Sequence, residues 1–190
     1  CSLDWSPLRY AQPVNLKLGN QVEHKGIMII KRISSFLMLV CLQATAAEFD
    51  LNAVVLGKLK IGSAISVIQQ QLPHCTFTKN ERTEWGAGGL FHQNWQSKSC
   101  GVEFDIVSDT KNSAQSISSM SIQSPSTLVT DRGVSIGSNA SDITSHYKNY
   151  VNSEESPPKK VIVIGSIYGG IQFFLQQDTV QSIFVGASAE

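Results

Sequence analysis

Residues 59–72 read LKIGSAISVIQQQL, and residues 134–147 read VSIGSNASDITSHY. Both segments contain an Ile-Gly-Ser triplet, and after each triplet apolar residues recur at steps of three and then four. These steps place the apolar side chains on one face of a helix. The match predicts that the chain uses the same helix-forming unit twice.

The serine of each triplet is well suited to begin a helix. The hydroxyls of Ser63 and Ser138 are expected to accept hydrogen bonds from free amides of the first turn. The glycine before each serine lets the backbone turn from a strand into a helix. The apolar face of each helix is then predicted to consist of Ile65, Ile68 and Leu72 in the first unit and Ala140, Ile143 and Tyr147 in the second.

Alternating apolar residues follow both helices. The segments GVEFDI (101–106) and GIQFFL (170–175) match each other, as do ISSMSI (117–122) and VQSIFV (180–185). This period of two is typical of half-buried strands, and one more strand is expected at 90–95 and at 160–167. Strands joined by short turns form an antiparallel meander, which a helix must cover. The predicted fold class is α+β, with two tandem repeats that each pack a helix on a three- to four-stranded antiparallel sheet.

We place the first repeat at 47–125 and the second at 126–190. The boundary falls in the segment SPST (124–127), because proline and serine are typical of linkers. Residues 153–158 are predicted to form an exposed loop. The sequence leaves open whether the two repeats share one continuous sheet.

A secretory signal peptide is predicted at 28–46, within the sequence MIIKRISSFLMLVCLQATAA (28–47). Two basic residues precede a short apolar run, and Ala44-Thr45-Ala46 provides a cleavage site, so we expect cleavage near Ala46 and a periplasmic location. The run is too short to span a membrane, so no membrane insertion is expected after cleavage. Residues 1–27 are expected to be upstream sequence that is not translated, or a disordered arm.

The charge balance after the signal excludes two classes of partner. From Ala47 onward the chain has 10 Lys and Arg against 13 Asp and Glu. Nucleic-acid binding requires a clustered basic face, and attraction to anionic lipid also requires positive charge. We therefore expect neither nucleic acid nor a membrane surface as the partner.

Cys75 and Cys100 are the two cysteines that follow the signal. In an exported chain such a pair predicts a disulfide bond, which is expected to staple the first repeat. The alternative is a zinc site or a reactive thiol built from His74, Cys75, His92 and Cys100. The adjacent His74 and Cys75 lack the usual spacing of zinc ligands, so we expect no metal and no cofactor.

No set of residues in the sequence has the pattern of a catalytic site. No serine lies in a Gly-x-Ser-x-Gly elbow. Asp105 and Asp109, at the end of a predicted strand, are not expected to face a shared site. The histidines therefore lack the convergent partners that catalysis requires, and no catalytic residue is predicted.

Aromatic residues provide the candidates for contact with a partner. Trp85 and Trp95 lie in a segment that has no close match in the second repeat, and Tyr150 is expected to lie on the second predicted helix. Exposed aromatic side chains are frequent anchors at interfaces. We therefore select Trp85, Trp95 and Tyr150 as candidate partner-binding residues.

The pattern G-x-x-IG-S with its apolar spacing, followed by G-h-x-F and V-x-S-I-x-V (h, an apolar residue), resembles the small α+β modules of the outer-membrane lipoprotein SmpA/OmlA group. The tandem arrangement over residues 56–187 also resembles the beta-lactamase inhibitory proteins, which repeat such a module twice and carry disulfides in it. This resemblance implies an exported bacterial protein that binds another protein.

The function predicted from the sequence is that of a non-enzymatic periplasmic protein-binding module. Its partner is expected to be another protein of the cell envelope, either as the target of an inhibitor or immunity-like factor or in envelope assembly. One alternative is a thiol- or zinc-dependent periplasmic enzyme that uses His74, Cys75, His92 and Cys100. A second alternative is a purely structural envelope protein.

Overall fold

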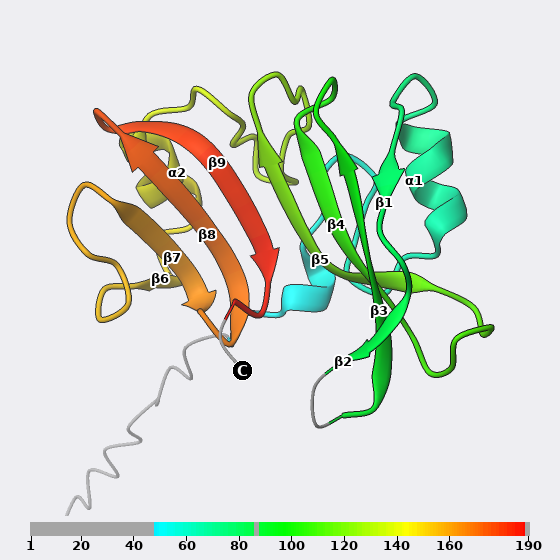
Figure 1. Ribbon diagram of the computed structural model, residues 1–190. Coiled ribbons are helices and arrows are strands. Elements are labelled where there is room, and N and C mark those ends of the chain that lie inside the picture. Colours follow the sequence, from blue (N-terminus) through cyan, green and yellow to red (C-terminus); the bar gives the residue numbers. More distant parts are fainter. Residues whose placement is uncertain (1–47, 86–87, 189–190) are drawn as a thin grey trace, which may run out of the picture. The chain divides into compact units, whose positions relative to one another are not determined.

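The computed structural model of the chain describes residues 48–85 and 88–188 (Figure 1). The predicted signal peptide and the segment before it lie outside these residues. The described elements are a 3-10 helix η1 (Leu51–Ala53), two α-helices, α1 (Ile65–Gln71) and α2 (Ala140–His146), and the strands β1 (Thr78–Lys79), β2 (Thr83–Trp85), β3 (Leu90–Ser97), β4 (Val102–Ser108), β5 (Ser116–Gln123), β6 (Val151–Asn152), β7 (Val161–Ser166), β8 (Gly169–Gln176) and β9 (Thr179–Gly186).

All nine strands belong to one antiparallel sheet. Its order is β1-β3-β4-β5-β9-β8-β7-β6, and β2 pairs with β3 beside β1. Strands β5 and β9 join the two parts of the chain, in a register that runs from Met120 opposite Val185 to Gln123 opposite Ser182. We call β1–β5 the first half of the sheet and β6–β9 the second half. Figure 1 shows them in green and in orange to red.

The predicted α+β fold, with two repeats that each pack a helix on its own sheet, is wrong. The described part of the chain is β-rich: in it a single nine-stranded sheet accompanies two α-helices of only seven residues each. Two separate sheets would have left the outer edges of β5 and β9 unpaired, and an exposed edge is prone to associate with other strands. The pairing of β5 with β9 removes both edges.

The core lies on one face of this sheet. A row of opposed residues crosses both halves on that face: Trp95, Phe104, Met120, Val185, Ile171 and Ile164. All six are buried, and Ile68 of α1 and Ile143 of α2 belong to the same hydrophobic cluster. Each short helix thus contributes one fully buried residue of the predicted face, and α2 is followed by the buried Tyr147.

The two Ile-Gly-Ser triplets bind to the sheet in the same way. Gly62 N donates to Ile117 O at 2.8 Å, and Ile117 N donates to Ser63 O at 2.9 Å. The second triplet repeats this pair of bonds with Val180, through Gly137 N and Ser138 O, both at 2.9 Å. Ile117 and Val180 are the second residues of β5 and β9. The triplets therefore fix the chain before each helix to one of the two central strands.

Neither triplet serine caps its helix. The residues at the cap positions are Ala64 and Asn139. The hydroxyls of Ser63 and Ser138 instead accept from the amides of residues three positions earlier, Lys60 and Ser135. The prediction failed because a serine hydroxyl also bonds readily to the backbone of a tight turn.

The face of the sheet opposite the core differs between the halves. In β4 every second residue is buried, and the residues between them, such as Glu103 and Asp105, are partly exposed. In the second half, Val163 lies opposite Gln172, and the row continues through Phe184 and Ser121 to Glu103, so all of these residues lie on the same face. Val163 and Gln172 are nevertheless only 0% and 6% exposed. The first half therefore leaves this face open, and we call its surface the open face.

Candidate functional site

A hollow of about 350 Å³ lies on the open face of the first half. We call it the His92 pocket, and its lining residues are Asn80, Thr83, Trp85, His92, Asn94 and Asp105. Strand register explains why they meet. Thr83 of β2 lies opposite His92 of β3, and Asn94 of β3 lies opposite Asp105 of β4. Trp85 is two residues beyond Thr83, and Asn94 is two residues beyond His92, so each pair points to the same side of the sheet.

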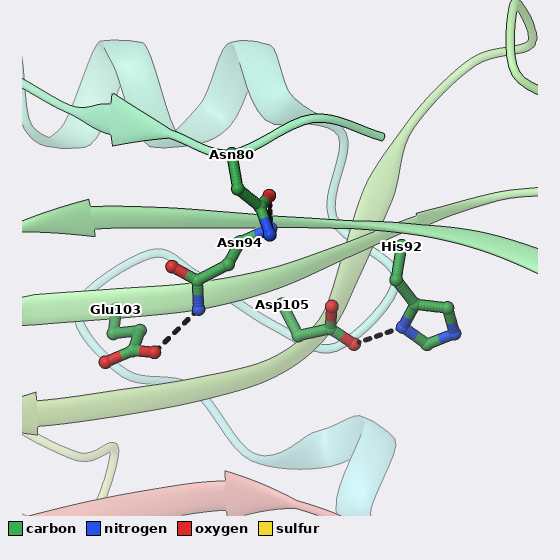
Figure 2. Close-up of polar contacts among 5 residues, drawn as sticks. All are labelled: Asn80, His92, Asn94, Glu103 and Asp105. Atoms are coloured by element: carbon green, nitrogen blue, oxygen red, sulfur yellow. Dashed lines mark hydrogen bonds and ion pairs between the residues drawn. The ribbon is translucent and has the colours of Figure 1, made fainter. Parts of the chain in front are cut away.

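His92 and Asp105 form the central contact of the pocket. His92 Nδ1 lies 2.8 Å from Asp105 Oδ2, and this is the one ion-pair contact among the described residues. The side chains are 16% and 26% exposed, so both reach solvent. Figure 2 shows that the second carboxylate oxygen of Asp105 points away from the imidazole ring. Asp105 Oδ1 has no hydrogen-bond partner among the described residues.

Amide side chains fix the floor next to this pair (Figure 2). Asn80 Oδ1 accepts from Asn94 N at 2.7 Å, and Asn94 Nδ2 donates to Glu103 Oε1 at 2.6 Å. The other oxygen of Glu103 accepts from Gln96 Nε2 at 3.3 Å. The polar groups of this surface are therefore ordered before any ligand arrives.

Trp85 forms the apolar wall of the pocket. It is 60% exposed, and its ring centroid lies 5.1 Å from that of His92, with the two planes 85° apart. Leu90, directly opposite Trp85 on β3, is 37% exposed. The indole is thus held in place by a neighbour while most of its surface remains in water.

The other two predicted partner-binding residues lie elsewhere. Trp95 is 3% exposed, belongs to the core face, and has Lys79 Nζ 3.4 Å from its ring centroid. Tyr150 is half-buried and packs edge-on against Phe49, with a centroid distance of 5.6 Å. Trp95 was misassigned because it alternates with His92 and Asn94 on a strand that buries its other face. Of the three candidates, Trp85 alone lines the His92 pocket.

The predicted disulfide is confirmed. Cys75 and Cys100 are bonded, with their Cα atoms 5.8 Å apart. The bond joins the segment after α1 to the turn between β3 and β4. His92 does not lie at the disulfide but in the His92 pocket, where it contacts Asp105. Among the residues that the structure describes, no group of three or more His, Cys, Asp or Glu side chains could hold a metal. Of the four residues of the predicted alternative enzyme site, His74, Cys75 and Cys100 line one hollow, and His92 lines another.

Sequence reasoning missed the polar partners of Trp85. Asn80, Thr83 and Asn94 were not identified, and Asp105 was weighed only as a member of a pair with Asp109. A signal was present, because Glu103 and Asp105 alternate with apolar residues on one predicted strand, and His92 and Asn94 are two residues apart on the strand before it. Two such polar rows on paired strands indicate a common surface.

Tyr147 is a buried ionisable group outside the pocket. It is 1% exposed, and its hydroxyl has no hydrogen-bond partner within the described part of the chain. Burial raises the pKa of Tyr147 to about 12, although the Thr130 side chain and the Arg132 guanidinium act in the opposite direction. The nearby Asp131 carboxylate adds to the effect of burial. The corresponding residue in the first sequence match is Leu72, and Tyr147 likewise belongs to the core, where it also lines a hollow of about 130 Å³ together with Arg132 and Tyr150.

No helix in residues 48–85 and 88–188 is long and apolar enough to cross a membrane. Comparisons with protein-family models, with curated proteins and with solved structures found no match.

Proposed function

We propose that the protein is a non-enzymatic binding protein that contacts another protein through the open face, with Trp85 as the central contact. The observation that carries the proposal is the 60% exposure of Trp85 beside an ordered polar pocket. Tryptophan is among the residues that most often dominate binding energy, because a partner removes a large apolar area from water.

The polar surroundings of Trp85 support the same function. Protein interfaces combine aromatic anchors with a polar rim that makes directed hydrogen bonds. Here the polar groups beside Trp85 are already ordered by the hydrogen bonds between Asn80 and Asn94 and between Asn94 and Glu103. Groups that are already ordered lose little conformational entropy on binding, so more of the contact energy appears as affinity.

The compartment is part of the proposal. Disulfide bonds persist in oxidising compartments, and Cys75–Cys100 is such a bond. With the predicted signal peptide at 28–46, it favours a periplasmic protein whose partner lies in the cell envelope. An inhibitor, an immunity-like factor and an assembly accessory all meet this description.

The test is a comparison of three full-length chains, each carrying an affinity tag and purified from envelopes of the source cells. They are the wild type, Trp85→Ala, and Tyr168→Ala as the control. Tyr168 is 67% exposed and lies in the turn between β7 and β8, away from the pocket residues. Quantitative mass spectrometry is expected to find a protein that the wild type and Tyr168→Ala retain equally and that Trp85→Ala retains roughly ten-fold less. Equal retention by all three chains would refute the proposal.

A further inference from the structure

We infer that the His92 pocket takes an arginine side chain of the partner protein. The inference rests on the proposed function and deepens it, because it states which chemistry the open face recognises. Three features of the pocket carry it: the sign of its charge, an unused acceptor on Asp105, and the exposed ring of Trp85.

The open face carries the carboxylates Glu103 and Asp105, and Asp105 contacts His92. The cations next to the pocket residues in the sequence are engaged elsewhere, because Lys79 lies over the Trp95 ring on the core face and Arg82 donates to Lys111 O. Strands β2 to β5 contain Glu84, Glu103 and Asp105 and no Lys or Arg within their bounds. Glu103 and Asp105 both lie on the open face, since they alternate with the buried Val102, Phe104 and Ile106. Complementary charge steers a partner to such a surface and repels acidic competitors.

Asp105 has one oxygen that is ready to accept. Its Oδ2 is used by His92, whereas Oδ1 has no partner in the described residues and points away from the ring (Figure 2). Glu103 differs, because its two oxygens accept from Asn94 and Gln96. The carboxylate that lines the pocket is therefore the one that remains able to bind an incoming donor.

Trp85 explains why arginine fits better than a simple cation. A guanidinium group is planar, stacks on an indole face and donates hydrogen bonds in its own plane. It can therefore contact the ring of Trp85 and the carboxylate of Asp105 at once. A lysine ammonium is more strongly hydrated and cannot stack, and a hollow of about 350 Å³ has room for the longer side chain.

The experiment titrates the full chain with N-acetyl-arginine amide and, as the matched probe, with N-acetyl-citrulline amide. Citrulline keeps the shape of arginine but replaces the charged guanidinium with a neutral urea. The readout is the NMR signal of the Trp85 indole N–H, assigned with Trp85→Phe. Arginine is expected to shift this signal with a dissociation constant on the order of 10 mM, because one side chain supplies only a few contacts. Citrulline is expected to bind at least five-fold more weakly.

Two variants place the preference on Asp105. Asp105→Asn removes the charge and is expected to abolish the difference between the two probes. Asp109→Asn removes an exposed carboxylate beyond the end of β4 and is expected to leave the difference unchanged. Equal binding of arginine and citrulline by the wild type, or an intact preference in Asp105→Asn, would overturn the inference.

These outcomes separate the inference from the proposed function. Loss of partner capture in Trp85→Ala without any arginine preference would keep the protein-binding function and remove the arginine. A clear arginine preference with normal capture by Trp85→Ala would instead show that the pocket binds guanidinium groups without mediating the partner contact.

Discussion

Strands β4 and β8 hold equivalent places on either side of the central β5–β9 pair, but they are buried differently. In β4 buried and partly exposed residues alternate along the whole strand, whereas β8 has four consecutive buried residues, from Gly170 to Phe173. In the second half, Gln172 Nε2 donates to Ser188 Oγ, and Ser156 Oγ accepts from Val163 N. The loop 153–158 and the last described residues therefore cover a face that the first half leaves open.

The two halves also differ in charge. The strands β6 to β9 contain no Asp, Glu, Lys or Arg, whereas β2 to β5 contain Glu84, Glu103 and Asp105. A covered face cannot keep an unpaired charge, because removing an ion from water is costly. An open face can keep a charged side chain, because that side chain remains in contact with water. The second half therefore buries residues on both faces of its strands, whereas the first half leaves one face partly exposed.

The disulfide lies in the first half alone, and its removal is expected to have the largest effect on stability. Replacing Cys75 and Cys100 by alanine should lower the free energy of unfolding by roughly 3 kcal/mol, since a bond across 25 residues restricts the unfolded chain. Urea denaturation measures the change. The reduced wild type is the control and should match the variant. A loss of less than about 1 kcal/mol would mean that the open half does not depend on its staple.

Tyr147 should make the stability of the second half depend on alkaline pH. Its pKa is raised to about 12 in the folded protein, above the ordinary value of 10.0, so folding favours the protonated phenol. The contribution is fully present below pH 10 and is lost as the pH rises through 12. The free energy of unfolding should fall by about 2 kcal/mol over this interval from this residue.

Tyr147→Phe is the control for this pH effect. It removes an unpartnered buried hydroxyl, so it should be neutral or slightly stabilising at pH 8. It should also show a smaller decrease in stability than the wild type between pH 10 and pH 12. Parallel pH profiles for the two proteins would contradict the burial of the phenol in the native state.

Ser156 tests whether the loop protects the second half. Its hydroxyl bonds to Asn152 O and Val163 N. Ser156→Ala should therefore cost about 1 kcal/mol and speed hydrogen exchange at the Val163 amide. Ser153→Ala alters an exposed serine of the same loop and serves as the matched control. Unchanged exchange at Val163 in Ser156→Ala would show that something other than this contact protects β7.

Asp105→Asn is expected to have the smallest effect on folding. The contact with His92 is partly exposed, and such pairs contribute less than about 1 kcal/mol. The same substitution should remove the preference of the pocket for arginine. A loss of stability above about 2 kcal/mol would indicate that the pair holds the sheet together, which would contradict its assignment to binding.

The sequence predicted local structure better than it predicted the fold. The spacing after each Ile-Gly-Ser triplet located both helices, and the period of two located strands such as β4 and β9. The union of the halves was not predictable, because it depends on the pairing of Met120–Gln123 with Ser182–Val185, far apart in the chain. Alternation alone does not state which strand edge meets which.

The candidate site was predicted in part for a similar reason. Trp85 was selected from its residue type, and its part in binding stays a prediction. The disulfide was predicted from two cysteines that follow the expected signal peptide, and it is confirmed. Trp95 was assigned to the surface because its type is the same, and only the sheet register shows that it faces the core. The shared position of Asn80 and Asn94 beside Trp85 could not be predicted, because it depends on the pairing of β1 and β2 with β3.

The most direct test of the open face is site-specific photo-crosslinking in the source cells. A photoreactive phenylalanine derivative replaces Thr83, an exposed residue of the His92 pocket, in one strain, and Tyr168 of the covered half in another. We expect a discrete crosslinked adduct with one envelope protein at position 83 and none at position 168. An adduct at 168 alone, or no adduct at 83, would contradict this expectation.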